Sequence, residues 1–308
     1  GVFAVKRDFI SIADWQTEDL ERIFALTAEL KEKQKRGETR PYLGGKTLGM
    51  IFEKSSTRTR VSFEVGMVQL GGYPLFLDTR STQLGRGEPI EDTARVLSRY
   101  VDGIMIRTFA HDNITEMARW ASVPVINGLS DLLHPCQVMA DLFTVLEHKK
   151  SIRDLTYCWI GDGNNMANSW LNAAAAFGFE LRLATPRGYE PDAAILEKAR
   201  TRGARVLLTN DPLAAARGAH VLNTDVWASM GQEEEQQKRQ KDFAGFQINQ
   251  ETLQVADAEC LVLHCLPAHR GEEISAEVLE GPHSVVFDEA ENRLHVQKGI
   301  LVTLLASG

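Results

Sequence analysis

The densest group of side chains capable of chemistry is the run Ser55-Ser56-Thr57-Arg58-Thr59-Arg60. It lies between a strand-like segment at 50–53 and a helix-like segment at 61–70. The start of a helix offers unpaired backbone N–H groups and the positive end of a dipole, and arginines add forked, permanently charged donors. The run therefore predicts a site for a phosphate-sized dianion. Serine and threonine that only cap the helix, with the arginines in solvent, are the plainer alternative. The Gly-Lys-Ser/Thr pattern of a P-loop is missing.

Two more polar positions follow predicted strands. Arg107 ends the strand-like segment 103–107, and His134-Pro135-Cys136-Gln137 begins another helix. Pro135 suits the first helical turn, and His134 and Gln137 would then face the same edge of the sheet, where both can donate to a carbonyl oxygen. A histidine before a helix is more often an incidental cap. Polar groups at three strand ends of one parallel sheet nevertheless favour a binding site.

The run Gly161-Asp162-Gly163-Asn164-Asn165-Met166 is similar to a dinucleotide-binding fingerprint. Met166 occupies the place of the third glycine, and no acidic ribose partner is clearly placed after the next strand. We therefore interpret the asparagines as groups that grip a polar substrate, with turn-forming asparagine as the alternative. An NAD-dependent oxidoreductase remains the rival from another class, and NADH binding tests it.

Two motifs follow apolar runs further along the chain, 225–231 (Asp-Val-Trp-Ala-Ser-Met-Gly) and 264–267 (His-Cys-Leu-Pro). Cys265 could be a nucleophile served by His264 and Asp225. Neighbouring residues of an extended strand point to opposite faces, so His264 is badly placed to activate Cys265. A packed, inert thiol is the favoured interpretation.

These motifs are positioned by strand-like segments that alternate with helix-like ones, which predicts parallel βαβ units with functional loops at the strands' carboxyl ends. The expected strands are 47–53, 73–77, 103–107, 123–126, 156–160, 180–184, 204–208, 221–226 and 261–266. The expected helices are 15–30, 61–70, 91–100, 114–121, 135–148, 168–177 and 293–305.

The pattern restarts near residue 147, where the charge rises. We predict an α/β protein of two domains, 1–147 and 148–292, each a parallel β-sheet flanked by helices. A C-terminal helix, 293–308, is expected to pack back on the first domain. The charged run 233–241 is expected to be a solvated helix face.

Composition limits the class of protein. The 308 residues include 34 Lys and Arg against 42 Asp and Glu, a net charge of −8, with 44% hydrophobic residues, as in an ordinary globular protein. The acidic balance without a basic stripe argues against nucleic acid as a partner. No membrane span or secretory signal is visible. The four cysteines are too few for a disulfide scaffold and lack zinc-site spacing, so we expect a reduced, cytoplasmic protein without a bound metal.

The ordered set Ser-Thr-Arg-Thr-Arg, His-Pro-x-Gln, Asp-x-x-x-Ser-Met-Gly and His-Cys-Leu-Pro resembles the aspartate/ornithine carbamoyltransferase family over nearly the whole chain. The last two motifs resemble its ornithine members rather than its aspartate members. The resemblance implies one domain for carbamoyl phosphate, one for the amino acid, a homotrimer or a multiple of trimers, and no cofactor. The implied reaction moves the carbamoyl group to the δ-amine of L-ornithine and gives L-citrulline and phosphate, a step of arginine biosynthesis or of a urea cycle.

Residue roles carried over from the resemblance divide into two sets. Those implied to bind carbamoyl phosphate are Ser56, Thr57, Arg58, Thr59, Gln83, Arg107, His134, Gln137 and Arg293, with Gln83 reaching the phosphate of a neighbouring subunit. Those implied to bind ornithine are Asn165, Asp225, Ser229, Met230, Cys265 and Leu266. The implied catalytic residues are Arg107, His134, Gln137, Asp225 and Cys265.

Three alternatives stay open. The acceptor could be another amine, such as putrescine or a modified ornithine, and the chain could be a non-catalytic subunit that only binds metabolites. Cys265 could handle a proton or only line the pocket. A product assay with several amines decides the acceptor, and ornithine-dependent release of phosphate would exclude a non-catalytic subunit.

Overall fold

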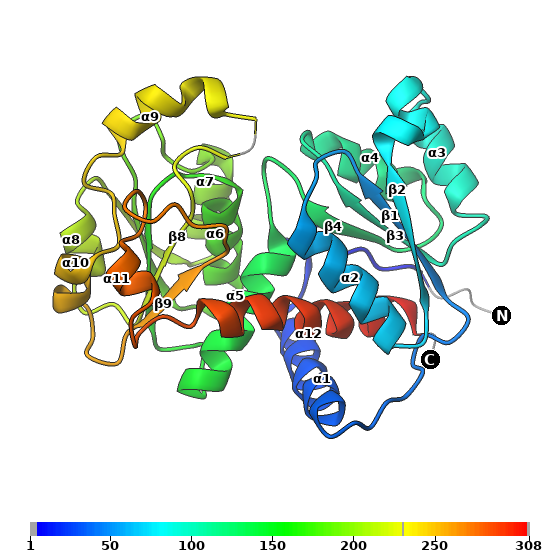
Figure 1. Cartoon of the computed structure of the whole chain (residues 1–308), viewed down its shortest axis with the longest axis horizontal. Coiled ribbons are helices and arrows are strands. Elements are labelled where there is room, and N and C mark those ends of the chain that lie inside the picture. The colour runs from blue at the N-terminus through cyan, green and yellow to red at the C-terminus, as the bar shows by residue number, and fades with distance from the viewer. Residues whose placement is uncertain (1–4, 230, 307–308) are drawn as a thin grey trace. The chain divides into compact units, whose positions relative to one another are not determined.

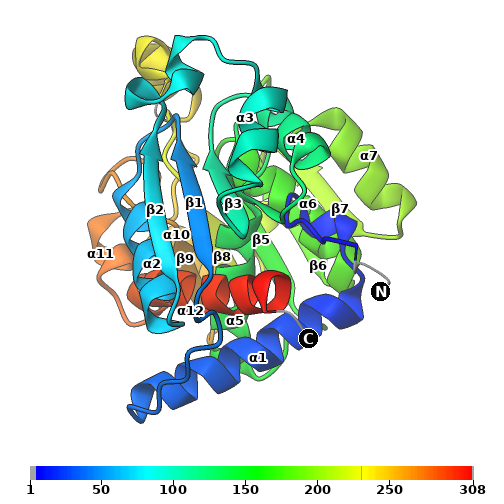
Figure 2. The same cartoon turned by 90° about the vertical axis from the view of Figure 1, so that its right-hand side faces the viewer.

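The computed structural model describes residues 5–229 and 231–306 (Figures 1 and 2). The chain divides into two compact units, which we describe separately. The first unit contains the residues up to Met139 and those from Arg293 onward, and the second contains Ala140–Asn292. Two helices, α5 (Pro135–Lys149) and α12 (Val286–Leu305), contribute residues to both units.

The first unit is built on a four-stranded parallel sheet in the order β2-β1-β3-β4. Its strands are β1 (Thr47–Phe52), β2 (Tyr73–Asp78), β3 (Gly103–Arg107) and β4 (Val125–Leu129). Phe52 pairs with Arg107, and Arg107 pairs in turn with Leu129. The segments that follow β1, β3 and β4 therefore begin at the same edge of the sheet.

The helices of this unit cover the sheet and receive the end of the chain. They are α1 (Thr17–Lys35), α2 (Thr57–Gln69), α3 (Ile90–Leu97) and α4 (His111–Trp120), with short 3₁₀ turns η1 (Ile12–Asp14), η2 (Thr79–Ser81) and η3 (Gln83–Arg86). Lys298 of α12 donates to Gln34 of α1 (3.2 Å) and to Gln69 of α2 (2.9 Å). A Cβ on Gly299 would lie 2.4 Å from Thr27 Oγ1, so α12 packs tightly on α1. The predicted return of the C-terminal helix to the first unit is confirmed.

The second unit has a five-stranded parallel sheet in the order β7-β6-β5-β8-β9. Its strands are β5 (Thr156–Ile160), β6 (Glu180–Ala184), β7 (Arg205–Thr209), β8 (Val221–Thr224) and β9 (Leu261–His264). Its helices, besides parts of α5 and α12, are α6 (Asn165–Phe177), α7 (Ala193–Thr201), α8 (Pro212–Ala216), α9 (Gln236–Asp242), α10 (Gln250–Val255) and α11 (Ala276–Leu279), and η4 spans Glu233–Glu235.

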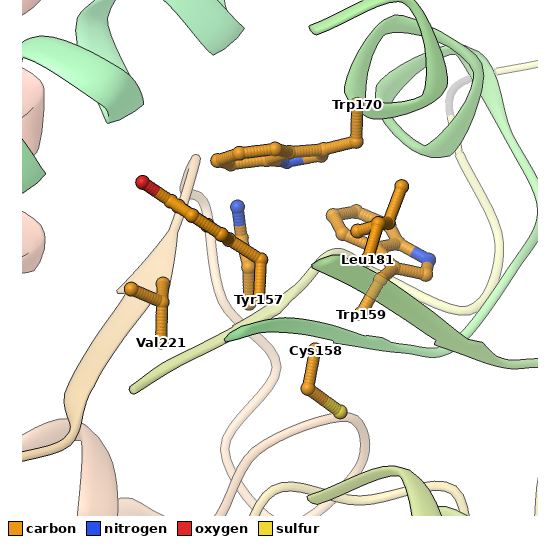
Figure 3. Close-up of a pocket in the computed structure, with 7 residues that line it drawn as sticks. Tyr157, Cys158, Trp159, Trp170, Leu181 and Val221 are labelled. Atoms are coloured by element: carbon orange, nitrogen blue, oxygen red, sulfur yellow. The ribbon is translucent and has the colours of Figure 1, made fainter. Parts of the chain in front are cut away.

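Aromatic rings form one part of the core of the second unit. Tyr157 of β5 lies 4.1 Å from Phe179 and 5.2 Å from Trp170 of α6, measured between ring centroids. Figure 3 shows the narrow space beside Tyr157 and Trp170, which is enclosed by buried side chains. Because every lining side chain is part of the core, this space is a packing gap and not a ligand site.

Several predicted boundaries are wrong because the caps and the tertiary contacts override the apolar period. The helix expected at 61–70 begins at Thr57, with Ser56 as its N-cap, and the terminal helix begins at Val286 instead of residue 293. The strands expected to run to 226 and 266 end at Thr224 and His264. The short helices α7, α8, α10 and α11 were not predicted. Among the described residues, no helix is both long and apolar enough to cross a membrane.

Candidate active site

The N-terminus of α2 has the geometry expected of an anion site. Ser56 is extended (φ −164°), and its Oγ accepts a hydrogen bond from the N–H of Thr59 (3.2 Å). The first hydrogen bond of the helix backbone runs from Arg60 N–H to Ser56 O (3.2 Å), so the N–H groups of Thr57 and Arg58 precede it and have no partner within the helix. The capping alternative is therefore true of Ser56, but it leaves donors at Thr57 and Arg58.

Buried arginines from two other elements meet this helix end. Thr59 Oγ1 accepts from Arg293 Nη2 (3.0 Å) and from Arg107 Nη1 (3.4 Å). Arg293 Nη1 also donates to Gln137 Oε1 (2.8 Å). All four side chains are buried, and they come from α2, β3, α5 and α12. Two guanidinium groups held in the interior by a hydroxyl and an amide favour an anion beside them.

His134 lies in the same region, directly before α5, and is also buried. Burial lowers its pKa well below the usual value of 6.5, and the positive charges of Arg293, Arg107 and Lys54 lower the pKa further. The imidazole is therefore neutral at neutral pH and can donate one hydrogen bond without carrying a charge. We refer to Thr59, Arg107, His134, Gln137, Arg293 and Lys54 as the cationic cluster.

Lys54 is a residue that the sequence reasoning missed. It lies between β1 and α2, is 94% buried, and has its ammonium nitrogen 5.5 Å from the ring centroid of Phe109. A lysine is almost never this deeply buried without a functional or paired role. Its place immediately after a buried strand, at the edge where Arg107 ends β3, is the signal that could have identified it.

Gln83, another predicted phosphate ligand, lies on an element that contributes nothing to the cationic cluster. It is exposed on η3, and among the described residues no hydrogen bond joins it to the cluster. It lines a separate pocket of about 150 Å³ with Ile51, Leu77 and Leu84. Within this chain, Gln83 is not brought together with the other predicted ligands.

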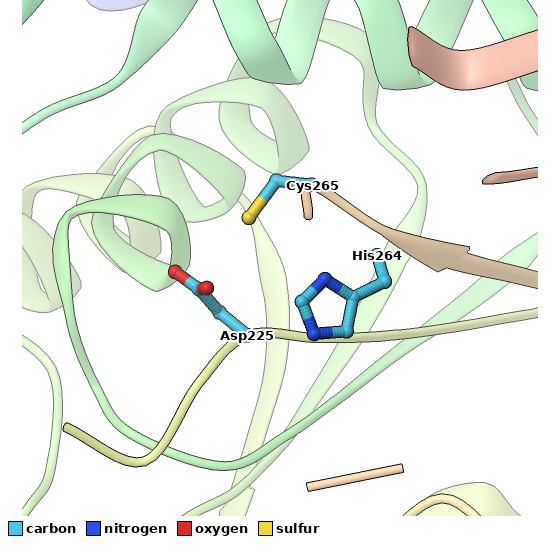
Figure 4. A group of neighbouring side chains, drawn as sticks. All are labelled: Asp225, His264 and Cys265. Carbon is cyan, nitrogen blue, oxygen red and sulfur yellow. The ribbon is translucent and has the colours of Figure 1, made fainter. Parts of the chain in front are cut away.

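In the second unit the predicted ornithine-binding residues gather around Asp225, which follows β8. Its Oδ1 accepts from the N–H of Val226 (2.7 Å) and its Oδ2 accepts from Asn164 Nδ2 (3.0 Å). The thiol of Cys265 is hydrogen-bonded to Asp225 as well, and the two side chains face each other in Figure 4. The sequence motif had indicated both asparagines as substrate contacts, whereas the set implied by the family resemblance named only Asn165.

The thiol of Cys265 is held in its protonated form. Loss of solvent around the sulfur raises its pKa well above the usual value of 9.0, and the carboxylates of Asp225 and Glu289 raise the pKa further. A nucleophilic cysteine needs the opposite environment, one that favours the thiolate. The favoured interpretation of Cys265 as a thiol without nucleophilic activity therefore agrees with its surroundings.

His264 and Cys265 do not point to opposite faces of a strand, as their adjacent positions had predicted. The strand β9 ends at His264, and ligand-capable atoms of Asp225, His264 and Cys265 lie within 4.8 Å of one another. His264 fails as a base for another reason. Its Nδ1 accepts from the N–H of Leu266 (2.8 Å), so Nε2 carries the proton and donates to the buried Glu273 (2.9 Å).

The same three side chains could in principle hold a metal ion. A cation there would have to displace the Leu266 N–H from His264 and remove the proton from the Cys265 thiol. The second such group, His269, Glu272 and Glu273, shares its Glu273 carboxylate with His264 and with the N–H of His269 (2.7 Å). The donor chemistry of both groups is that of hydrogen-bonded networks, and we assign no metal to either.

The remaining predicted residues lie around this centre. Asn165 is the first residue of α6, and Ser229 donates its N–H to Gln232 Oε1 (3.0 Å). Leu266 packs against the core of the unit, and Met230 lies outside the described residues. Gly163 is required by packing and not by a dinucleotide, because a Cβ there would lie 2.3 Å from the backbone nitrogen of Pro191.

The first unit thus presents the cationic cluster, and the second presents a group of carboxylates around a neutral thiol. The first set suits an anionic ligand, and the second suits a cationic or amine-bearing one. Comparison with known proteins defines the class. The family description "Aspartate/ornithine carbamoyltransferase, carbamoyl-P binding domain" matches residues 7–147, and "Aspartate/ornithine carbamoyltransferase, Asp/Orn binding domain" matches residues 153–304. The chain belongs to the aspartate/ornithine carbamoyltransferase family.

Three individual relatives are named for ornithine as the acceptor. The ornithine carbamoyltransferase of Syntrophotalea carbinolica is 70% identical over 98% of this chain and all of its own length. That of Pelobacter propionicus is 59% identical over 97% of this chain and 98% of its own. The structure of the Pyrococcus furiosus ornithine carbamoyltransferase is similar at a TM-score of 0.94 and 47% identity, covering 100% of this chain and 99% of that one.

Proposed function

We propose that the chain catalyses transfer of the carbamoyl group from carbamoyl phosphate to the δ-amine of L-ornithine, with L-citrulline and phosphate as products. The observation that carries the proposal is the segregation of charge. Three buried cations surround His134 in the first unit, whereas Asp225, Glu289 and Asp141 surround Cys265 in the second. The first set is complementary to a phosphate anhydride and the second to a cationic amino acid.

Carbamoyl phosphate binds residues 1–147 together with the helix at 293–308 in this proposal. The phosphate lies at the start of α2, where Ser56, Thr57, Arg58 and Thr59 offer N–H groups, hydroxyls and a guanidinium. Arg293 completes the anion pocket through Thr59 and Gln137. The proposed donors to the carbamoyl oxygen are Arg107, His134 and Gln137.

The amine that attacks the carbamoyl carbon must be neutral. A lysine-like amine has a pKa of about 10.4, so its neutral form at pH 7 costs about 4–5 kcal/mol. Partial desolvation in the second unit lowers this cost. The rate is therefore expected to increase with pH above neutrality, as the neutral fraction of ornithine increases.

As the new C–N bond forms, negative charge develops on the carbonyl oxygen. A donor aimed at this oxygen contributes about 3–4 kcal/mol by the precedent of oxyanion holes. His134 can supply such a donor because it is neutral and buried. The C–O bond to phosphate then breaks, and the departing phosphate takes the proton that the nitrogen loses.

Residues 148–292 bind L-ornithine in this proposal. Asn165, Asp225, Ser229 and Met230 hold the α-amino and α-carboxylate groups. Cys265 and Leu266 line the side chain that carries the δ-amine. Cys265 acts as a protonated thiol, so no thioester forms.

Replacing Cys265 by alanine is expected to raise the KM for ornithine about tenfold and to slow turnover, because a hydrogen-bonding contact to the acceptor is lost. Carbamoyl phosphate affinity, measured by calorimetric titration, should not change. Cys260→Ala is the matched control, since this buried thiol of the same unit bonds to the carbonyl of Leu261. A trapped acyl-cysteine in the unmodified protein would contradict the assignment.

The experiment that tests the function is a citrulline assay with carbamoyl phosphate and several amines at matched concentrations. We expect product with L-ornithine and at least a hundredfold less with putrescine or with an ornithine blocked at its α-amino group, because Asp225 and Ser229 then lose their partners. Equal rates with putrescine would show that the site does not select L-ornithine as its acceptor. Binding of both substrates without phosphate release would instead indicate a non-catalytic subunit.

We further propose that the protein assembles as a homotrimer or a multiple of trimers. Val61, Val65 and Val68 are exposed along one face of α2, and Tyr73 is exposed on β2, which is an edge strand. Exposed apolar groups beside a sheet edge favour association. Gln83, exposed on η3, is proposed to reach the phosphate site of a neighbouring subunit.

Subunit mixing tests this assembly. Gln83→Ala and Arg58→Gln homo-oligomers should each be nearly inactive. After random exchange, a site is intact when its own subunit has Arg58 and the adjacent one has Gln83, so about one quarter of the original activity should return. Activity that stays absent after verified exchange would show that Gln83 does not act across subunits.

We propose a cytoplasmic location. All four cysteines are free thiols, and burial raises the pKa values of Cys136 and Cys260 to about 12. Free thiols persist in reducing compartments. A fusion of the full chain to a fluorescent protein, followed by fractionation of the cells, tests this location.

A further inference from the structure

One side chain contradicts the expectation that residues 233–241 form a solvated helix face. Arg239 of α9 is 93% buried, whereas its neighbours Lys238 and Gln240 are exposed. A buried arginine requires partners for its charge and its donors. The function described above does not use this residue.

The guanidinium of Arg239 connects two separate loops. Its Nη1 donates to Asp162 Oδ2 (2.9 Å) and to the backbone carbonyl of Trp227 (2.7 Å). Its Nε donates to Glu235 Oε2 (3.2 Å), and its central carbon lies 5.0 Å from the ring centroid of Tyr189. The donors of one planar group are thus divided between the β5–α6 loop and the segment after β8.

Those two loops carry the proposed ornithine contacts. Asp162 lies three residues before Asn165, and Trp227 lies between Asp225 and Ser229. The indole of Trp227 is fixed as well, because its Nε1 donates to Phe246 O (3.2 Å). A shift of Trp227 would therefore move both flanking polar residues relative to Asn165.

We propose that Arg239 is a positioning residue for the amino acid substrate, which holds the Asp162 loop and the Trp227 segment in register so that Asn165, Asp225 and Ser229 face ornithine together. This proposal rests on the proposed function, since it assumes that ornithine binds these residues. Arg239 acts through the two loops and does not itself touch substrate.

The charge of Asp162 is part of this arrangement. Burial raises the pKa of Asp162 to about 6, with Arg239 opposing the shift and Asp225 and Glu235 adding to it. Above pH 6 the carboxylate is charged and pairs with Arg239, and as the pH falls below 6 the carboxyl group takes up a proton and the ion pair is lost. Low pH should therefore weaken ornithine binding beyond what titration of the amine explains.

The experiment measures the kinetics of Arg239→Gln, Arg239→Lys and Asp162→Asn in the full-length protein. In Arg239→Gln the KM for ornithine should rise at least tenfold. The kcat measured at saturating ornithine, and the affinity for carbamoyl phosphate, should each stay within about twofold to threefold of the values for the unmodified protein. Arg239→Lys keeps the positive charge but loses the planar guanidinium that donates to several partners at once, so part of the affinity for ornithine should return. Lys241→Gln, an exposed neighbour on α9, is the matched control and should be unchanged.

Two further readouts separate positioning from a merely structural role. Hydrogen–deuterium exchange should increase at residues 226–229 in Arg239→Gln and stay the same in β7. The ratio of ornithine KM between Asp162→Asn and the unmodified protein should shrink as the pH falls from 8 to 5. Because ornithine itself titrates equally in both assays, this ratio reports only the effect of the Asp162 charge on the ornithine KM.

An ornithine KM within twofold of the original in Arg239→Gln would overturn the proposal. A parallel loss of carbamoyl phosphate affinity in Arg239→Gln would also overturn the proposal, because it would indicate a general effect on folding. In that case Arg239→Lys would not recover the ornithine KM selectively. Absence of citrulline formation by the unmodified protein would instead refute the proposed function, while the exchange measurement would still test whether Arg239 holds the two loops.

Discussion

Replacing Arg58 by glutamine is expected to reduce carbamoyl phosphate affinity at least a hundredfold and to leave the stability of the fold unchanged. Arg58 lies in the first turn of α2, is exposed, and its own N–H precedes the hydrogen bonds of the helix. A guanidinium can bind a phosphate through two charge-assisted hydrogen bonds, each contributing about 1.5–3 kcal/mol. Losing both accounts for the predicted change, which calorimetric titration with carbamoyl phosphate measures.

The matched control is Arg60→Gln, two residues further along the same turn. Arg60 is paired with Glu64 (2.8 Å) and lies over the ring of Phe76, 3.6 Å from its centroid. Its replacement should change carbamoyl phosphate affinity less than twofold. Equal losses in the two variants would show that general positive charge binds the phosphate and that the helix start has no special role. Unfolding temperatures of both variants should stay close to the original.

Replacing His134 by alanine is expected to lower kcat by about a hundredfold to a thousandfold, the typical effect of losing one donor to a developing oxyanion. The expectation follows from the position of His134 beside Arg107 and Arg293 and from its neutral imidazole. Turnover at saturating concentrations of both substrates measures it. His134→Asn, which keeps an N–H donor, should recover part of the rate, and His148→Ala, which removes an exposed histidine bonded to Asp288, should change nothing.

The pH dependence gives an independent check on His134. Its pKa is lowered well below 6.5, so between pH 6 and pH 8 the imidazole does not titrate. The rate should rise smoothly through this range as ornithine loses its proton. An inflection near pH 6.5 that disappears in His134→Asn would mean that the cationic form of the imidazole is catalytically important, which contradicts the assignment.

Local patterns predicted most of the sheet framework. Strand β3 (Gly103–Arg107) and strand β5 (Thr156–Ile160) have the predicted bounds. Each is a short apolar run between polar turns, so its ends are determined by residues close in sequence. Helix starts were less predictable. Ser56 and Asn164 start their helices three or four residues before the apolar period begins, because their side chains satisfy the first N–H groups.

The site residues divide in the same way. The hydroxyl and arginine run at the start of α2 was identified from residue types and spacing, and so were His134 and Gln137. The resemblance to a family supplied Gln83 and Arg293. Neither source identified Lys54 or Arg239, because a lysine and an arginine in polar segments are ordinary surface residues until burial is known.

The sequence by itself determined the alternation of strands and helices and the placement of polar groups at strand ends, because both follow from local periodicity and from the chemistry of single residues. Only the tertiary structure decided which charges meet. Arg293 reaches Thr59 across 234 positions of sequence, and the neutral form of His134 and the protonated thiol of Cys265 follow from burial and from charges on other elements. Desolvation and Coulomb interactions depend on distance in space, which the order of residues does not contain.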